Sequence, residues 1–292
     1  MKSFSFLTPL LLAVSLGCGN QKQDQHTDST EGSDAKPVTL TRVWETDPVL
    51  TTCESVLYDE SQNVLYVSNI NGAPDGKDGN GFISRLSLEG EILDLEWVRG
   101  IDAPKGMGLH NGKLYVTDID RVHEINTADG NITRTYPVEG ATFLNDIAVD
   151  NGKVYISDSR GGAIYVIEDG ELSTFMRDLK GPNGLFVDGD RLLVAFWGES
   201  TLNTLDPSTK EVIKRTEGIE NPDGIEAIGD NEFLVSSWNG IIHHIDSDWN
   251  RTVLLDTRQD SVHSADIGYV KAKNLLLVPT FFKNTVVAYE VK

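Results

Sequence analysis

Short runs of alternating apolar and polar residues recur along the chain from residue 38 to its end. One unit runs over residues 145–149 (NDIAV), turns at Asn151-Gly152, and returns over residues 154–158 (VYISD). Alternation with a period of two is typical of β-strands. Asn-Gly favours the positive φ angles of a tight hairpin turn. The pattern therefore predicts a series of β-hairpins.

The hairpin unit is repeated six times. The units begin at residues 54, 105, 145, 183, 223 and 265, so they follow one another at intervals of about 40 residues after a longer first interval. Units of this length, with a turn signal every ~8 to 12 residues, are typical of the blades of a β-propeller. We therefore predict an all-β fold, a six-bladed β-propeller over residues 38–292.

The last repeat is one strand short. It ends at residues 286–291, which correspond to the third strand of a blade, and no fourth strand follows. Residues 39–44 (TLTRVW), ahead of the first blade, have the mixed apolar and polar character of a fourth strand. We therefore predict that this N-terminal strand completes the last blade and closes the ring, which removes an open sheet edge.

The first 37 residues differ from the rest. Lys2 precedes an apolar stretch over residues 4–16, which is followed by Gly17-Cys18. This arrangement resembles a bacterial lipobox and predicts a lipoprotein-type signal peptide over residues 1–17, with lipidation at Cys18; a plain secretory signal is the alternative. Residues 18–37 are polar and predict a disordered tether. We expect a cell-envelope lipoprotein of a Gram-negative bacterium, in the periplasm or on the outer surface, which contacts the membrane only through its lipid anchor.

The charge of the chain excludes one class of partner. The 45 Asp and Glu residues outnumber the 25 Lys and Arg residues, for a net charge of −20. Binding to a phosphate backbone needs clustered cations, so nucleic acid is not an expected partner. An acidic surface attracts cations and favours solubility. We expect a monomer that acts on a small-molecule substrate.

Propeller geometry predicts which side chains meet at one mouth of the channel. The first residue of each unit should form an inner ring, made of Glu54, Lys105, Asn145, Asn183, Asp223 and Ala265. The second strand returns to the same face and should add an outer ring, made of Asn69, Asp118, Asp158, Phe196 or Trp197, Trp238, and Thr280 or Phe281. Carboxylate and amide oxygens suit a hard cation such as calcium. Trp197, Trp238 and Phe281 would give an apolar wall for an organic ligand.

A purely structural interpretation of these positions stays open. Pro182-Asn183-Gly184 and Pro222-Asp223-Gly224 also suit a turn that leads from a loop into a strand, where these residue types are favoured for backbone reasons.

Several motifs resemble one enzyme family. They are Glu54, Asn145-Asp146, Pro182-Asn183-Gly184-Leu185, Pro222-Asp223-Gly224-Ile225 and Trp238-Asn239-Gly240, and together they resemble the gluconolactonase and senescence-marker-protein (regucalcin) family. Residues 143–147 are similar to a third-blade motif of the related paraoxonases. The resemblance covers residues 39–292 and implies a six-bladed propeller with one divalent metal ion, usually calcium, in the channel mouth.

The resemblance also implies roles for individual residues. Glu54, Asn183 and Asp223 would bind the metal with Asn145 beside them, and Asp223 would activate water to hydrolyse a lactone or related ester. Asp146 would touch a second, structural calcium. The family's sugar-binding residues have no counterparts in this sequence, so the substrate is not implied.

Other interpretations remain open at this point. A non-catalytic NHL-like propeller that binds a ligand or partner protein has similar repeats, and a strictosidine-synthase-like propeller shares the fold. The glycine-rich segment over residues 70–81 predicts either a lid or rim at the mouth, or a surface insertion. His263 is either a base at the mouth or an ordinary loop histidine.

Overall fold

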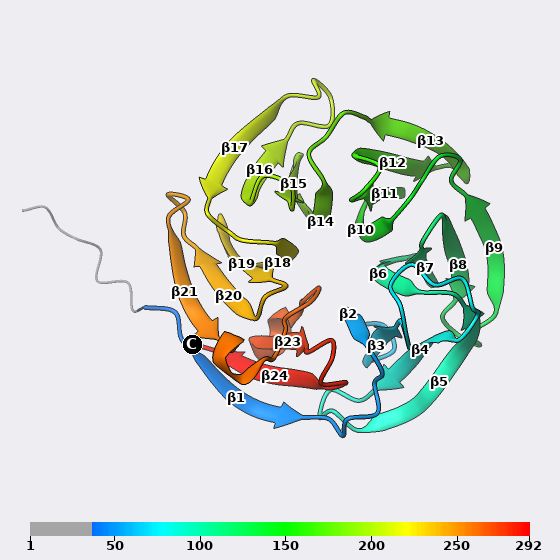
Figure 1. Cartoon of the computed structure of the whole chain (residues 1–292), viewed down its shortest axis with the longest axis horizontal. Coiled ribbons are helices and arrows are strands. Elements are labelled where there is room, and N and C mark those ends of the chain that lie inside the picture. The colour runs from blue at the N-terminus through cyan, green and yellow to red at the C-terminus, as the bar shows by residue number, and fades with distance from the viewer. Residues whose placement is uncertain (1–36) are drawn as a thin grey trace, which may run out of the picture. The chain divides into compact units, whose positions relative to one another are not determined.

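The computed structural model describes residues 37–292, which form six four-stranded sheets arranged around a central channel (Figure 1). The predicted signal peptide, Cys18 and all but the last residue of the predicted tether lie outside these residues. Neighbouring strands in each sheet are antiparallel, and the first strand of each blade is the one nearest the channel. The predicted six-bladed propeller is confirmed.

The first five blades each follow the order of the chain. Their strands are β2 (Cys53–Asp59), β3 (Val64–Asn69), β4 (Gly81–Leu86) and β5 (Ile92–Ile101); β6 (Pro104–His110), β7 (Lys113–Asp118), β8 (Arg121–Asn126) and β9 (Ile132–Pro137); β10 (Leu144–Asp150), β11 (Lys153–Asp158), β12 (Ala163–Glu168) and β13 (Glu171–Met176); β14 (Pro182–Asp188), β15 (Arg191–Phe196), β16 (Thr201–Leu205) and β17 (Val212–Glu217); and β18 (Pro222–Gly229), β19 (Glu232–Ser237), β20 (Ile241–Ile245) and β21 (Arg251–Asp256).

The sixth blade joins the two ends of the propeller. It contains β22 (Gly268–Val270), β23 (Leu275–Pro279), β24 (Val286–Val291) and, outermost, β1 (Leu40–Glu45). β1 pairs antiparallel with β24, with Leu40 opposite Val291 and Glu45 opposite Val287. The predicted closure by the N-terminal strand is therefore confirmed. The backbone groups of β24 that would otherwise form an open edge are paired.

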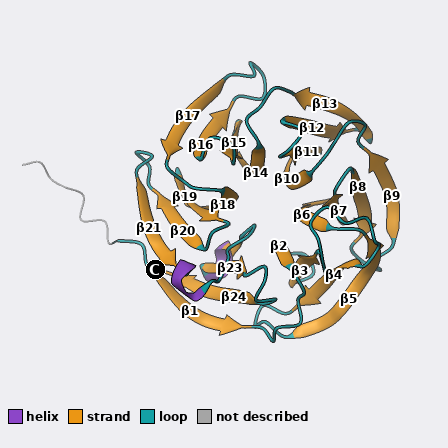
Figure 2. Ribbon diagram, in the orientation of Figure 1, coloured by secondary structure: helices purple, strands orange, loops and turns teal. Residues whose placement is uncertain are grey.

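Secondary structure other than strands is sparse in the described part of the chain. Two short 3-10 helices, η1 (Arg258–Asp260) and η2 (Lys271–Lys273), flank the start of the sixth blade (Figure 2). No helix within residues 37–292 is long and apolar enough to cross a membrane.

The predicted hairpin turns explain how the strands pair. Asn111-Gly112 and Asn151-Gly152 each join the first two strands of a blade, and both residues of each pair have positive φ. Asp169-Gly170 does the same between β12 and β13. Two consecutive positive φ angles give the turn whose twist matches that of the flanking strands.

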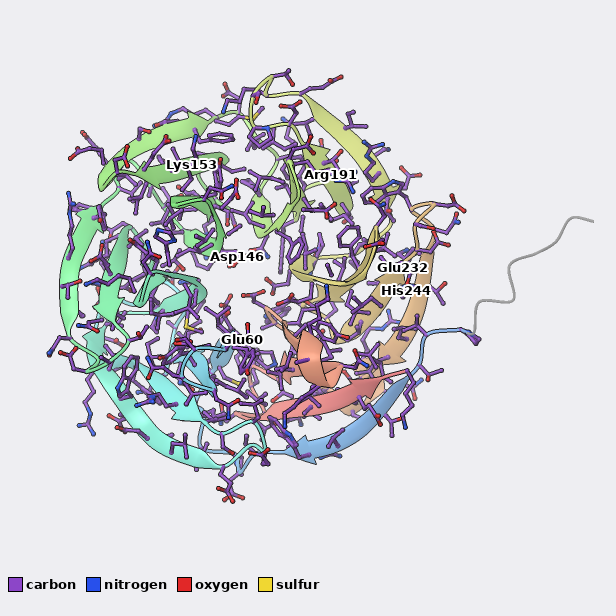
Figure 3. The ribbon with its side chains drawn as sticks, turned by 180° about the vertical axis from the view of Figure 1, so that it is seen from behind. Glu60, Asp146, Lys153, Arg191, Glu232 and His244 are labelled. Atoms are coloured by element: carbon purple, nitrogen blue, oxygen red, sulfur yellow. The ribbon has the colours of Figure 1, made fainter. Side chains whose placement is uncertain are left out.

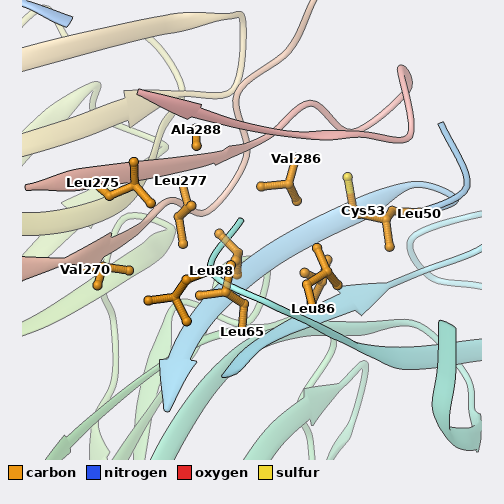
Figure 4. Close-up of a cluster of buried hydrophobic side chains, with 12 residues drawn as sticks. Leu50, Cys53, Leu65, Leu86, Leu88, Val270, Leu275, Leu277, Val286 and Ala288 are labelled. Carbon is orange, nitrogen blue, oxygen red and sulfur yellow. The ribbon is translucent and has the colours of Figure 1, made fainter. Parts of the chain in front are cut away.

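The apolar faces of neighbouring blades pack against each other. One such core lies between the first and sixth blades and includes Cys53, Leu65, Leu277 and Val286, all fully buried (Figure 4). The Cys53 thiol donates a hydrogen bond of 3.2 Å to the carbonyl oxygen of Thr285. Burial raises the pKa of this thiol to about 12, so Cys53 is an unreactive part of the core.

Glycines allow the blades to approach closely around the channel. A side chain at Gly184 would overlap the carbonyl oxygen of Asp223, and one at Gly106 would overlap Asp146. At Gly224, a side chain would meet Asp266 and the backbone nitrogen of Ile267. The innermost strands therefore pack backbone against backbone, which fixes the residues next to these glycines around one narrow ring.

Candidate functional site

A pocket of about 480 Å³ opens at one mouth of the channel. Its lining residues come from all six blades: Glu54, Ile70, Pro74, Lys105, Phe143, Asn145, Ser159, Arg160, Asn183, Trp197, Asp223, Trp238, Phe281 and Phe282. The structure thus brings together five of the six predicted inner-ring residues and all three predicted aromatic residues. Ala265 is buried and does not line the pocket.

The inner-ring side chains share one position in the fold. Glu54, Lys105, Asn145, Asn183 and Asp223 are each the second residue of an innermost strand. Since successive side chains of a strand point to opposite sides, equal positions in equivalent strands direct these five side chains to the same part of the channel. All five are buried, with Lys105 and Asn183 at 1% exposure.

Asn183 and Asp223 are directly linked. The Asn183 amide nitrogen donates hydrogen bonds to Oδ1 of Asp223 at 2.9 Å and to the carbonyl oxygen of Pro222 at 3.2 Å. The Ser159 hydroxyl lies 2.9 Å from the carbonyl oxygen of Pro182 and 3.3 Å from Oδ1 of Asn183, so its one proton is shared between these two acceptors. These bonds fix both side chains in the pocket across the boundary between the fourth and fifth blades.

Two buried oxygens of the pocket have no hydrogen-bond partner among the described residues. They are Oε2 of Glu54 and Oδ1 of Asn145. Buried polar atoms are nearly always paired in folded proteins, because losing contact with water costs free energy. Two unpaired oxygens in one pocket therefore indicate that a further positively polarised group belongs there.

The pKa values of the buried charged groups in the channel also favour a bound cation. Burial raises the pKa of Glu54 well above its usual value, and the charges of Asp223 and Asp266 raise it further. Burial followed by the charge of Asp266 also raises the pKa of Asp223. Burial lowers the pKa of Lys105 to about 8 against the opposing effect of Glu54. A bound cation would stabilise the ionised carboxylates and lower their pKa values.

The donor set is compatible with a hard cation, although it is not a cluster of charged ligands. No group of three His, Cys, Asp or Glu side chains within residues 37–292 is placed to hold a metal ion. The predicted ligands are two carboxylates, Glu54 and Asp223, and two amides, Asn145 and Asn183. Calcium accepts amide and carboxylate oxygens together and completes its coordination with water, so these residues fit such an ion.

The aromatic wall extends beyond the residues predicted from the sequence. The ring centroids of Trp197 and Trp238 lie 6.4 Å apart, and those of Trp238 and Phe281 lie 5.7 Å apart. Phe282, which the sequence interpretation missed, adds a ring that is 59% exposed at the rim. His263 packs on Trp238 with a centroid distance of 4.2 Å but does not itself line the pocket, and burial lowers its pKa.

The segment over residues 70–81 forms part of the rim. Ile70 and Pro74 line the pocket. Asp75 forms an ion pair of 2.9 Å with Arg160 of the third blade, and Lys77 pairs with Asp120 of the second. Phe143 and Arg160 are further lining residues that the repeat pattern did not single out, since both lie in loops between strands.

Three predicted outer-ring residues do not lie in the pocket. Asp118 accepts hydrogen bonds from the Ala103 backbone nitrogen at 2.8 Å and from His123 at 3.0 Å. Asp158 accepts from the backbone nitrogen of Phe143 at 2.9 Å, and Asn69 donates to the carbonyl oxygen of Val67. The prediction was wrong for Asn69, Asp118 and Asp158. The aspartates instead satisfy backbone groups of the loop that leads into the innermost strand.

Asp146 lies on a different cavity. It borders a second space of about 370 Å³ along the channel, together with Asp266 and Glu226. Figure 3 shows Asp146 beside the channel, whereas Lys153 and Glu232 lie further out on their blades. Both carboxylate oxygens of Asp146 accept backbone hydrogen bonds, from Ile147 and Leu185, at 2.6 Å each. They are thus satisfied by the protein itself.

Comparison with known proteins identifies the fold. No family model matches the sequence, and no curated protein matches it at a significant level. The similar solved structures include a catalytically inactive virginiamycin B lyase from Staphylococcus aureus with quinupristin, at 15% identity and a TM-score of 0.59, covering 87% of this chain and 99% of that one. A streptogramin B lyase has 15% identity and a TM-score of 0.62, with 88% and 98% covered. A nidogen/laminin complex has 20% identity and a TM-score of 0.62, with 74% and 84% covered. These are six-bladed propeller proteins, one group enzymatic and one engaged with a protein partner.

Proposed function

We propose that the protein is a hydrolase of lactones or related esters that uses a divalent cation, calcium foremost, in the pocket at the channel mouth. The unpaired buried oxygens of Glu54 and Asn145 are the observation that carries this proposal. They share the pocket with Asn183 and Asp223. The motif resemblance to gluconolactonases and regucalcin supports the same four residues as ligands.

The four proposed ligands would have different roles in holding the ion. Glu54 and Asp223 supply the negative charge that holds the ion, and Asn145 and Asn183 supply neutral oxygens. When bound, calcium polarises the carbonyl group of the ester and stabilises the negative charge that develops on its oxygen. Asn183 fixes the orientation of the Asp223 carboxylate through the 2.9 Å hydrogen bond.

Asp223 is our candidate for the general base. It would accept a proton from the water molecule that attacks the ester carbon. A general base is most effective when its pKa lies near the working pH, and burial, followed by the charge of Asp266, raises the pKa of Asp223 above the usual value of a carboxyl group. A bound cation would lower the pKa of Asp223. The basicity of Asp223 would therefore depend on the balance between burial and Asp266, which raise its pKa, and the cation, which lowers it.

The remaining walls suit a small organic molecule. A volume of about 480 Å³ is of the size found for small-molecule sites, which range over about 300–1,000 Å³. Trp197, Trp238 and Phe281 would pack on the apolar part of the substrate and displace water from it. The catalytic groups and the aromatic wall would thus hold the ester between them.

A second candidate is a non-catalytic propeller that binds a ligand or partner protein at the same mouth. The exposed rings of Phe282, at 59%, and Trp197, at 37%, favour it, because exposed aromatic residues are enriched at binding surfaces. The fold similarity to a nidogen/laminin complex agrees with this candidate, as that to streptogramin lyases agrees with an enzyme.

A hydrolysis assay separates the two. The full chain, stripped of metal with a chelator, is tested on a panel of lactones and aryl esters with and without added calcium. We expect calcium-dependent hydrolysis that is lost in Asp223→Asn and kept in Asp169→Asn, which makes the same change in an exposed hairpin turn. Hydrolysis that is indifferent to both chelation and Asp223→Asn contradicts the proposal. Calcium binding without any hydrolysis favours the second candidate.

A further inference from the structure

We propose that the substrate of this pocket carries an anionic group, a carboxylate or its equivalent, which Lys105 and Arg160 bind next to the ring of Phe143. This inference rests on the proposed function and specifies its substrate class. Both cations line the pocket, and neither belongs to the proposed metal ligands or to the aromatic wall.

Lys105 is a buried cation without a counter-ion. Its side chain is 1% exposed, and its ammonium group donates to the carbonyl oxygen of Ala103 at 2.9 Å. No carboxylate within residues 37–292 lies close enough to form an ion pair with it. An ammonium group has three donors, so two of them are free to bind a ligand. A buried charge is costly unless it is paired.

Arg160 extends the same cationic side toward the rim. It lies in the loop between β11 and β12, and one guanidinium nitrogen pairs with Asp75 at 2.9 Å. The guanidinium carbon lies 4.1 Å from the centroid of the Phe143 ring, and the Lys105 nitrogen lies 4.5 Å from it. Guanidinium has five donors in a planar fork, which leaves donors for a second carboxylate.

The balance of charge in the pocket favours an anion. Glu54 and Asp223 would neutralise a divalent ion, and Asp75 neutralises Arg160. The charge of Lys105 then remains without a partner among the lining residues. Glu54 exerts the largest opposite charge on Lys105, followed by Asp118. Glu54 would be engaged by the metal ion, and Asp118 is already hydrogen-bonded to His123 and the backbone. An anionic group on the substrate would neutralise this remaining charge of Lys105.

The order of the blades places the cationic and the aromatic lining residues on opposite sides of the pocket. Lys105 comes from the second blade and Phe143 and Arg160 from the third, whereas Trp238 and Phe281 come from the fifth and sixth (Figure 1). The cationic and aromatic sides therefore face each other across the channel mouth. A molecule with an anionic end and an apolar end spans the pocket, with its ester group near the candidate metal ligands.

A matched pair of probes tests this inference. Phenylacetate and phenylacetamide have the same ring and differ in charge, and their affinities are measured by titration calorimetry or ligand-observed NMR in calcium-containing buffer. We expect phenylacetate to bind at least about tenfold more tightly, since a charge-assisted hydrogen bond contributes that much or more. Lys105→Met, which keeps the length of the side chain, should remove this preference. Arg160→Gln should reduce it, and Lys153→Met, a partly exposed control outside the pocket, should keep it.

The possible outcomes are distinct. Equal affinity for both probes overturns the inference, and so does a preference that persists in both Lys105→Met and Arg160→Gln, because a metal ion alone would then explain it. Arg160 is about half exposed, so its variant decides the question if Lys105→Met fails to fold. The same titrations in chelator isolate the proposed function. A preference that is lost in the variants but indifferent to calcium supports the anion site and contradicts only the metal.

Discussion

The side-chain amide of Asn183, in the fourth blade, donates a hydrogen bond of 2.9 Å to the carboxylate of Asp223, in the fifth. The bond crosses the boundary between two blades whose apolar faces share one core, which includes Leu193 of the fourth blade and Phe233 of the fifth. The geometry of the site therefore depends on how closely adjacent innermost strands pack, and not on either blade alone. Gly184, directly after Asn183, controls that approach because a side chain there would overlap the Asp223 backbone.

Gly184→Ala should damage both stability and the site. The added methyl group would push the fifth blade away from the fourth, and forced overpacking costs about 1–3 kcal/mol. We expect a lower free energy of unfolding in urea and a weaker response to calcium in the same samples. Gly229→Ala is the matched control, because its new methyl group would make only ordinary contacts, the nearest at 3.6 Å. Equal effects of the two variants would contradict this role of Gly184.

Trp44→Ala should weaken the closure of the ring. Trp44 lies in β1, and its indole N–H donates to the carbonyl oxygen of Leu88 in the first blade at 3.0 Å. Its ring packs on the core between the first and sixth blades. We expect a loss of about 2–4 kcal/mol in urea unfolding. Val43→Ala, at a neighbouring exposed position of the same strand, should change stability by less than about 0.5 kcal/mol. Similar losses in both variants would mean that this contact is not what holds β1.

Asp266→Asn should change how stability depends on pH. Burial, opposed by a hydrogen bond from Ser55, raises the pKa of Asp266 from 3.8 to about 7. The folded protein thus keeps a proton that the unfolded chain releases. The contribution of protonated Asp266 to the free energy of unfolding is fully present below the pKa of this group in the unfolded chain. It is lost as the pH rises through the pKa of the group in the folded protein.

The asparagine variant cannot ionise at this position. In chelator, its free energy of unfolding relative to the native protein should therefore rise between pH 5 and pH 8.5 by roughly 2–3 kcal/mol. Urea unfolding at both pH values measures the change, with Asp169→Asn as the control. A difference between variant and native protein that stays constant with pH would contradict the raised pKa.

The sequence was sufficient to predict the fold and five of the six inner-ring residues, all except Ala265, which does not line the pocket. Alternation with a period of two and a repeat of about 40 residues predicted the blades, and the missing last strand predicted the pairing of β1 with β24. Glu54, Asn145, Asn183 and Asp223 were predicted together because they occupy equivalent positions in equivalent strands, and strand geometry then determines where their side chains point.

The loop residues were harder to predict. Phe143, Arg160 and Phe282 line the pocket from segments between strands, whose conformation depends on tertiary contacts such as the pair between Arg160 and Asp75. Asp118 and Asp158 were misplaced for a related reason. The loops that lead into the innermost strands contain backbone N–H groups that need acceptors, at Ala103 and Phe143. Asp118 and Asp158 accept these hydrogen bonds, which hold their carboxylates away from the channel mouth.

Calcium titration of the full chain by calorimetry is the decisive test of a metal site at the channel mouth. We expect the chelated protein to bind calcium, and an ion at 100 times its dissociation constant to stabilise the fold by about 2.7 kcal/mol. Glu54→Gln and Asp223→Asn should each weaken binding by at least about tenfold, because each removes a charged ligand, while Asp169→Asn should bind as the native protein does. If the native protein binds no calcium, or if both pocket variants bind it unchanged, Glu54 and Asp223 do not form a calcium site.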